Sequence, residues 1–156
     1  MSEVRIRVAE PRDLPRVAEL WSALVASEQA LGAPLRMNEH SPQQWLASFE
    51  RHLGRFAFLW VAEQGGEVRG YLLARLRTVP AYVGGELAGE ISSIFVDEAI
   101  RRRGSGEQLV RIAIDTLGDA GARAIEVEAH ECNPDARAFW ESQGFATAAR
   151  TYRLAR

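Results

Sequence analysis

The sequence predicts an α/β fold with a mixed, mostly antiparallel central sheet of about six to seven strands and about four helices on both faces. Two observations predict it. The spacing of apolar residues changes along the chain between the period of a strand and that of a helix. A first half rich in hairpins is followed by a β-α-β unit, which makes the sheet mixed.

The first elements are a strand and two helices. Residues 4–8 alternate apolar and charged side chains, as a strand with one buried face does. A helix follows with Asp13 as its N-cap, and it ends before Gly32. Ser41 is the predicted N-cap of a second helix, with Pro in the next position. The apolar positions of this second helix are Trp45, Leu46, Phe49 and Leu53.

The elements that follow are strands, then alternating helices and strands. Residues 56–63 and 68–77 are β-rich and are joined through Gly65-Gly66, a tight-hairpin signal. After a loop, residues 87–96 form the next strand. The remaining elements are a helix over 104–117, a strand over 123–129, a helix from Asn133 to Gly144, and one or two short terminal strands within 146–154.

Length and composition limit the class of protein. A chain of 156 residues with 47% hydrophobic residues suits one domain, residues 1–156, with a core that needs no metal. The single cysteine, Cys132, excludes an internal disulfide. With no apolar leader or membrane span, we expect a soluble, cytoplasmic protein without a membrane partner. A net charge of −2 with interspersed signs gives no reason to expect a nucleic-acid partner.

Residues 90–107 carry the main chemical signal. A strand runs into a turn with three arginines and then into an amphipathic helix that begins around Gly104 and Gly106. The first turn of a helix has unpaired N–H groups and a partial positive charge, and glycines let a ligand approach the backbone closely. This pattern favours a pyrophosphate site. By itself it is equally compatible with a tight turn whose arginines are solvated.

Two motifs resemble those of the GNAT superfamily of N-acetyltransferases. The acetyl-CoA motif Q/R-x-x-G-x-G/A is similar to Arg101-x-x-Gly104-x-Gly106. The block N-x-x-A-x-x-F/L-Y-E-x-x-G-F is similar to Asn133-Pro134-x-Ala136-x-x-Phe139-Trp140-Glu141-x-x-Gly144-Phe145. The resemblance implies an acetyl-CoA-dependent N-acyltransferase, with acetyl-CoA as cosubstrate, that moves the acetyl group directly to a primary amine of a small molecule or peptide.

The resemblance also implies where the coenzyme binds. Backbone groups of Ile94 and Val96 would pair with the pantetheine arm, and N–H groups within 102–106 would hold the pyrophosphate. The amine would enter where the strands ending at Val96 and Ala129 splay apart. The predicted coenzyme-binding residues are Ile94, Phe95, Val96, Arg101, Arg102, Arg103, Gly104, Ser105, Gly106, Asn133, Phe139 and Trp140.

Glu90 is the candidate general base, because a carboxylate can take the proton that an ammonium substrate must lose. Some members of the superfamily carry their base 14 residues before the first motif Gly, the spacing of Glu90 to Gly104. The alternative is a solvated or salt-bridged strand residue. Glu128 and His130 are rival bases near the next strand end.

The proton donor to the departing CoA is less clear, because this chain has Trp140 where many members carry a tyrosine. An indole N–H has no useful acidity, so Trp140 is expected to pack the helix and to wall the pantetheine. Proton delivery would then fall to solvent or to Tyr152. Tyr82 and Glu128 are candidates for the substrate side.

The identity of the amine stays open. Glu39, Glu86 and Glu90 could give the acceptor side a negative field, which would favour a polyamine, an aminoglycoside-like compound or a basic peptide end. A homodimer is expected from the family. The alternative function is a catalytically inactive acyl-CoA sensor or scaffold of the same fold, and a third is a structural protein without a ligand.

Overall fold

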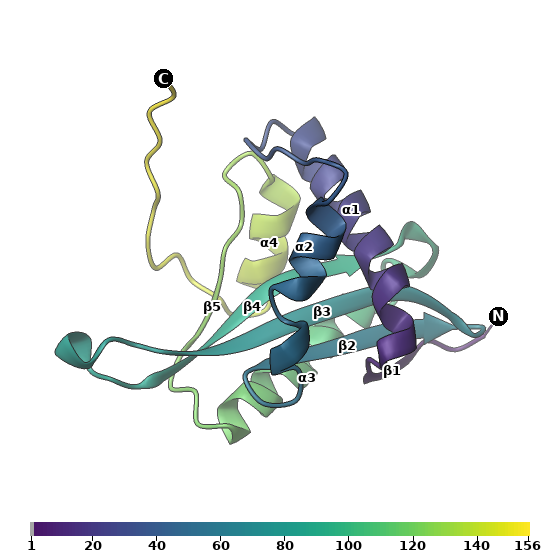
Figure 1. Cartoon of the computed structure of the whole chain (residues 1–156), viewed down its shortest axis with the longest axis horizontal. Coiled ribbons are helices and arrows are strands. Elements are labelled where there is room, and N and C mark those ends of the chain that lie inside the picture. Colours follow the sequence, from purple (N-terminus) through teal and green to yellow (C-terminus); the bar gives the residue numbers. More distant parts are fainter. Residues whose placement is uncertain (1) are drawn as a thin grey trace.

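The computed structural model describes residues 2–156 of the chain (Figure 1). In chain order, the strands and α-helices are β1 (Arg5–Val8), α1 (Leu14–Ala30), α2 (Ser41–Ala47), β2 (Ala57–Gln64), β3 (Glu67–Thr78), β4 (Leu87–Val96), α3 (Ser105–Asp119), β5 (Ile125–Val127) and α4 (Pro134–Ser142).

The sheet has the order β1-β2-β3-β4-β5, so strands that follow one another in the sequence are neighbours in space. The first three pairings are antiparallel, and only β4 and β5 run parallel, with α3 as the crossover between them. The prediction of a mixed, mostly antiparallel sheet is confirmed. Residues 2–156 form five strands, however, in place of the six to seven that the sequence predicted.

The difference lies mainly at the C-terminus. Residues 146–154, predicted as one or two strands, form no helix or strand. In Figure 1 this segment extends away from the rest of the protein. Tyr152 and Leu154, its large apolar side chains, are 89% and 86% exposed. Alternating side chains predict a strand only where a neighbouring edge can pair with it, and here the segment lies against no strand. The last sheet strand is also shorter than the predicted 123–129, since β5 has three residues.

Helices cover both faces of the sheet. In Figure 1, α1 and α2 lie on the near face and α3 on the far face. Alternate side chains of β3 enter the two cores: Tyr71 and Leu73 pack with α1, whereas Leu72 and Ala74 pack with α3 and with Trp140 of α4. The predicted helix cover is therefore present, with one hydrophobic core on each face.

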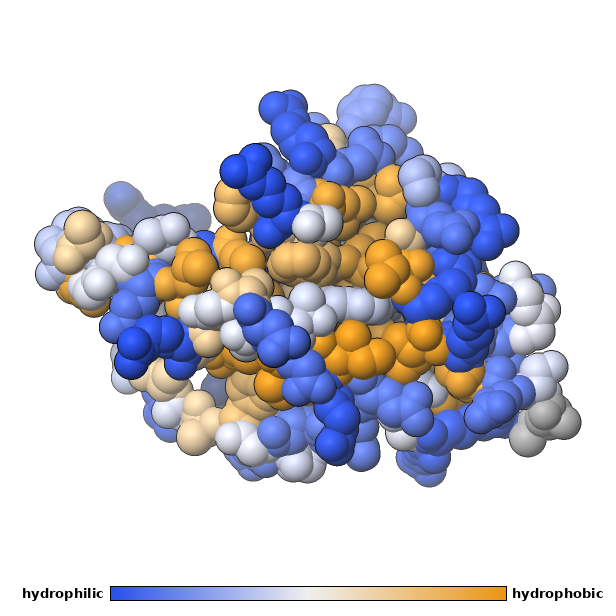
Figure 2. Space-filling view, turned by 90° about the horizontal axis from the view of Figure 1, so that it is seen from below, coloured by the Kyte–Doolittle hydropathy of each residue, from blue (hydrophilic) through white to orange (hydrophobic). Residues whose placement is uncertain are grey.

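Figure 2 shows the surface of the protein from below, with an apolar band between hydrophilic margins. The lobe that projects on its left is the loop between β3 and β4, at the left of Figure 1 as well. No helix within residues 2–156 is long and apolar enough to cross a membrane.

The β2–β3 hairpin turns at Gly65 and Gly66, with φ angles of +58° and +82°. Two successive positive φ angles are the requirement of the tight turn whose twist matches that of the flanking strands, and glycine meets it without strain. The hairpin predicted from Gly65-Gly66 is confirmed.

Of the two predicted N-caps, one is confirmed in position. Asp13 is the N-cap residue of α1, but its carboxylate makes no capping hydrogen bond to the helix; it accepts a hydrogen bond from the Glu10 N–H and pairs with Arg7, both at 2.7 Å. This arginine lowers the pKa of the Asp13 carboxyl. Ser41 is the first residue of α2 rather than its cap, and its hydroxyl accepts from the Asn38 N–H at 2.9 Å. Because α2 ends at Ala47, Phe49 lies beyond the helix, although it is buried as predicted.

Candidate active site

The sheet opens in the second half of β4. β5 pairs with β4 only over Gly89–Ile91, where Ile91 lies opposite Val127. Beyond Ile91, β4 continues for five residues, 92–96, along which β5 provides no partner. The register with β3 also shifts here, since Leu73 pairs with Ser93 and Ala74 with Ile91. Ser92 is therefore the extra residue of a β-bulge, and a bulge bends its strand away from a regular sheet.

The phase of the β3–β4 ladder decides which backbone groups face this free edge. The Asp97 N–H donates to the Arg69 carbonyl at 2.7 Å, so Asp97 and Phe95 direct their backbone groups toward β3. Ile94 and Val96 therefore direct theirs outward. A strand edge of this kind is a template for an extended ligand. These are the two residues whose backbone the sequence predicted to bind the pantetheine arm.

The turn between β4 and α3 has a backbone suited to an anion. Arg102 and Gly104 have φ angles of +63° and +78°, whereas the φ angle of Arg103 between them is not positive. Left-handed residues in a turn can direct backbone N–H groups toward one side, as in anion-binding nests. Gly104 immediately precedes α3, whose first N–H groups have no intrahelical partner. A Cβ on Gly104 would meet nothing within 4 Å, so the space beside this turn is open.

The two sequence motifs meet next to this turn. A Cβ on Gly106 would lie 3.5 Å from the ring of Phe139 and 3.9 Å from Val96 Cγ2. One residue of the first motif thus lies against Phe139 of the second and against the end of β4. Asn133 begins α4, where its side-chain oxygen accepts a hydrogen bond from the Ala136 N–H at 3.1 Å. Its amide N–H groups do not take part in this cap and can still donate to a ligand.

Arg101 and Trp140, two of the predicted coenzyme residues, have structural roles. The Arg101 Nε donates to the Val96 carbonyl at 2.7 Å, and its guanidinium lies 5.4 Å from the Phe95 ring centroid. Arg101 therefore ties the turn to the end of β4. Trp140 is 7% exposed and packs edge-on against Phe139 and Phe145. This burial agrees with the packing role that its sequence context predicts.

Glu90, the predicted base, lies two residues before the bulge. It is half-buried, and its Oε1 accepts a hydrogen bond from the Ser92 hydroxyl at 2.8 Å. In the sheet, Glu90 lies between Arg75 of β3 and Glu126 of β5. Glu90 therefore lies just before the point where β4 and β5 stop pairing, and its role as the general base stays a prediction. The carboxylate is held by a hydroxyl at the bulge, which is a suitable arrangement for accepting a proton directly or through water.

Tyr71 and Ser93 form a polar pair at the opening that sequence patterns do not indicate. Tyr71 is fully buried, and its hydroxyl lies 2.6 Å from Ser93 Oγ. Burial raises the pKa of the Tyr71 hydroxyl, and the nearby Glu28 carboxylate adds to the effect. Tyr71 therefore stays neutral. In the sequence, Tyr71 is indistinguishable from the apolar residues of an alternating strand, which is why it was missed.

A second pair links α1 to the segment after β5. His130 Nε2 lies 3.0 Å from Glu28 Oε2, whose side chain is only 18% exposed. Sequence reasoning does not single out Glu28 either, although a signal exists: Trp21, Val25 and Glu28 lie at i, i+4 and i+7 on one face of α1. A carboxylate on the apolar face of a helix is unusual. His130, a rival candidate for the general base, thus lies beside the Glu28 carboxylate.

The other predicted site residues lie apart from this opening or at its margin. Tyr82 is 87% exposed in the short turn Ala81–Val83, within the projecting β3–β4 loop of Figure 2. Tyr152 is in the extended C-terminal segment of Figure 1. Glu128 directly follows β5, and its side chain is exposed. The roles of Tyr82 and Glu128 in substrate binding and of Tyr152 in proton delivery stay predictions.

Glu28→Gln is expected to raise Tm by about 1–3 °C at pH 7.5. Burial raises the pKa of Glu28 more than His130 lowers it, so the folded protein binds this proton more tightly than the unfolded chain. The resulting stability is present below the unfolded pKa and is lost as pH rises through the folded pKa. The gain from glutamine should therefore shrink as the pH falls through the pKa of folded Glu28.

Thermal unfolding at pH 7.5 and pH 4 measures this effect. Glu141→Gln is the control, because Glu141 is an exposed glutamate of α4. A lower Tm for Glu28→Gln at pH 7.5 would mean that the ion pair with His130 outweighs the cost of burial.

Comparison with known proteins agrees with this geometry. The sequence profile of the Acetyltransferase (GNAT) family matches residues 17–145. A probable N-acetyltransferase of Mycobacterium tuberculosis is 28% identical over 159 residues, which cover 97% of this chain and 84% of that protein. The structure of a mutant protein from Bacillus halodurans has a TM-score of 0.82 at 25% identity and covers 97% of this chain and 99% of its own.

An aminoglycoside N-acetyltransferase in complex with CoA has a TM-score of 0.77 at 21% identity, over 100% of this chain and 96% of that one. At this identity the likeness shows the fold alone. The family profile extends from within α1 to just beyond α4, which is most of the chain. The protein therefore belongs to the Acetyltransferase (GNAT) family.

Proposed function

We propose that this acetyltransferase moves an acetyl group from acetyl-CoA directly to a primary amine of a small molecule or peptide. The observation that carries the proposal is the free edge of β4 beyond Ile91, which leads into the turn before α3. An extended ligand that pairs with the backbone of Ile94 and with the N–H of Val96, whose carbonyl accepts from Arg101, would reach the open space beside Gly104 at its anionic end. Acetyl-CoA has this form, with a pantetheine arm and a pyrophosphate.

The residues at the turn fit such a ligand chemically. Backbone N–H groups in 102–106 and the N-terminus of α3 supply donors and positive potential, which favour a pyrophosphate. Phe139 and Val96 line the neighbouring surface at Gly106. Asn133, at the start of α4, can donate a side-chain N–H from the other side.

The amine would approach from the side of β5, where the sheet opens. Glu90, directly or through a water molecule, takes a proton from the ammonium ion, and the free amine attacks the thioester carbonyl carbon. The new C–N bond forms, the nitrogen loses its second proton to water, and the C–S bond breaks with its electron pair on sulfur. Glu90 returns its proton to solvent. Ser93, hydrogen-bonded to the buried Tyr71, lies three residues along β4 from this base and offers a fixed dipole there.

The departing thiolate has two sources of a proton. A thiol pKa near 8.5 makes the thiolate a good leaving group, so water can protonate it without a side-chain acid. Tyr152 would serve only if the C-terminal segment folds back, because in this structure the side chain is exposed. Trp140 is buried and cannot supply a proton.

A screen of amines with acetyl-CoA and a thiol reagent tests the function. Release of CoA that depends on both the enzyme and an amine is the expected result, with stoichiometric N-acetyl product by mass spectrometry. A thermal-shift measurement with acetyl-CoA runs in parallel, because a ligand that binds the folded state raises Tm.

The two measurements separate the alternatives. A raised Tm without CoA release from any amine would indicate an acyl-CoA-binding sensor or scaffold. An unchanged Tm at saturating acetyl-CoA would contradict the coenzyme site itself.

A further inference from the structure

Arg75 of β3 differs from the other partly buried arginines. Within residues 2–156, the half-buried arginines are Arg7, Arg16, Arg69 and Arg75. The first three each form an ion pair with a carboxylate. No carboxylate of the described chain lies within 4.0 Å of the Arg75 guanidinium. A cation that is partly removed from water and left without a counter-ion is costly.

The hydrogen-bonding groups of Arg75 are also largely without partners. Its Nη2 donates to the Ser48 hydroxyl at 3.1 Å, and its Nε is buried without an acceptor in the described structure. A guanidinium has five N–H donors, and the bond to Ser48 uses one of them. Buried donors are normally paired. Arg69 Nε is also without an acceptor, but the Arg69 guanidinium pairs with Glu67 and Asp97, whereas Arg75 has no such carboxylate among the described residues.

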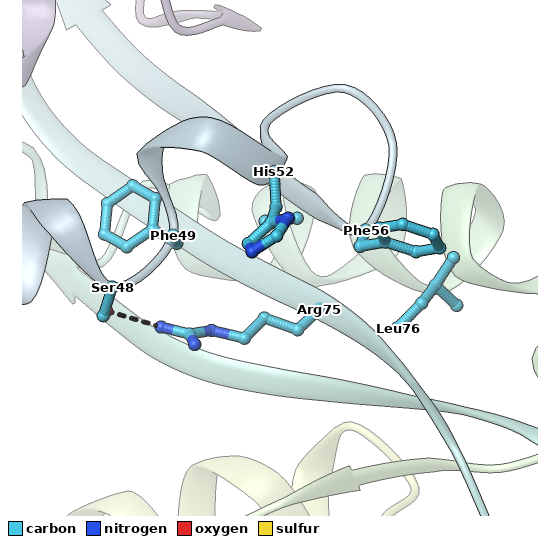
Figure 3. Close-up of a pocket in the computed structure, with 7 residues that line it drawn as sticks. Ser48, Phe49, His52, Phe56, Arg75 and Leu76 are labelled. Carbon is cyan, nitrogen blue, oxygen red and sulfur yellow. Dashed lines mark hydrogen bonds between the residues drawn. The ribbon is translucent and has the colours of Figure 1, made fainter.

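Arg75 borders a surface pocket of about 290 Å³. Figure 3 shows its side chain stretched along the pocket toward Ser48, with His52 and the rings of Phe49 and Phe56 on the other side. The guanidinium carbon lies 5.8 Å from the centroid of the Phe49 ring. The pocket therefore combines apolar walls with a cation, a hydroxyl and an imidazole, a composition typical of a small-molecule site with a few orienting polar groups.

This pocket is close to the proposed catalytic base. Arg75 and Glu90 are directly opposite each other in the β3–β4 register, so their side chains project from the same face of the sheet. The Glu90 carboxylate is bonded to Ser92 at the bulge, whereas the Arg75 guanidinium reaches in the direction of α2. A substrate whose amine lies at Glu90 would thus meet Arg75 on its α2 side.

We propose that Arg75, with His52, binds a carboxylate of the acceptor, so that the substrate is an amine that also bears a carboxylate. This inference rests on the acetyl transfer proposed above and names its substrate class. The planar guanidinium presents paired N–H donors that match the two oxygens of a carboxylate. Such a substrate would also supply the counter-ion that Arg75 lacks. Glu39 and Glu86, the exposed glutamates that would favour a polycationic acceptor, do not line this pocket.

Matched amines test the proposal. α- and ω-amino acids and the corresponding carboxamides are compared by CoA release in the wild type, Arg75→Gln and Arg75→Lys. The wild type should prefer the carboxylates by at least 10-fold in kcat/KM, the size expected for a charged hydrogen bond. In Arg75→Gln this preference should fall to about twofold or less, with rates on carboxamides within about threefold of wild type. Arg75→Lys, which keeps the charge without the planar fork, should be intermediate.

The control is Arg77→Gln. Arg77 is an exposed arginine of the same strand, and its Nη2 lies 2.9 Å from Glu126 Oε2. It should leave the preference unchanged. Since carboxamides and amino acids differ in the basicity of the amine, the readout is the change in preference between variants, in which that difference cancels. Acetyl-CoA must raise Tm in every variant, which establishes that each is folded.

Three outcomes overturn the inference. The first is no preference for carboxylates in the wild type, and the second is a preference that survives in Arg75→Gln. The third is equal losses of rate on carboxylates and carboxamides in Arg75→Gln, which would indicate that Arg75 has a structural role. In the first case CoA release from carboxamides still supports the proposed function. If no amine releases CoA, the proposed function fails instead. The pocket is then judged by thermal shift with the same compounds and CoA, where carboxylates alone should raise Tm in the wild type and not in Arg75→Gln.

Discussion

Gly104→Glu is expected to abolish measurable acetyl-CoA binding, a loss of at least about 10²-fold in Kd, or ~2.7 kcal/mol. Gly104 has a φ angle of +78°, and a Cβ there would meet nothing within 4 Å. The new side chain would thus extend into the open space beside the turn rather than clash with the protein. Its carboxylate would occupy the positive end of α3 and repel the pyrophosphate. Isothermal titration calorimetry measures the effect.

Two variants separate charge from backbone strain. Gly104→Gln introduces similar size and the same strain without a charge, so it should retain part of the affinity. Gly54→Glu places a glutamate at another glycine with positive φ, +88°, and open surroundings, away from the turn. It should lose a similar amount of stability and keep the Kd of the wild type. Unchanged Kd in a folded Gly104→Glu variant would refute this position for the pyrophosphate.

Glu90→Gln is expected to lower kcat by about 10²-fold near neutral pH, the lower end of what a positioned base contributes. Glutamine has nearly the same shape and can still accept the hydrogen bond from the Ser92 hydroxyl. The fold should therefore persist, and only proton acceptance is lost. Because free amine becomes abundant at high pH, the deficit should shrink as the pH rises. Profiles of kcat and kcat/KM against pH measure it.

The neighbouring carboxylate provides the control. Glu126 lies opposite Glu90 on β5 but is exposed and paired with Arg77, so Glu126→Gln should stay within about threefold of wild type. A wild-type rate and pH profile in Glu90→Gln would make Glu90 structural. Glu128→Gln and His130→Gln would then distinguish the two remaining candidates for the base.

The coenzyme side of the site could be predicted from the sequence because its features are local. A glycine with positive φ, the start of a helix and the strand before it are determined within a few residues of one another. The turn at Gly104, the hairpin at Gly65-Gly66 and the start of a helix at Asn133 were predicted for this reason. Family membership followed from the same short motifs, and the match over residues 17–145 confirmed it.

The acceptor side could not be predicted in the same way because its groups come from distant parts of the chain. Tyr71 and Ser93 are 22 residues apart, and Glu28 meets His130 only because α1 packs over the sheet. Arg75 resembles any other charged strand residue until its burial and its missing carboxylate partner are known. Such pairs carry no periodic signal, so only the folded chain reveals them.

The sequence alone therefore determined the order of the elements from β1 to α4, the mixed sheet, and the turn with glycines before α3, since local backbone preferences and side-chain periodicity specify these. The tertiary structure decided the bulge at Ser92, the early end of β5, and the absence of a strand in 146–154. Each of these depends on whether a second strand lies alongside to accept hydrogen bonds, and side-chain alternation in one segment does not contain that information.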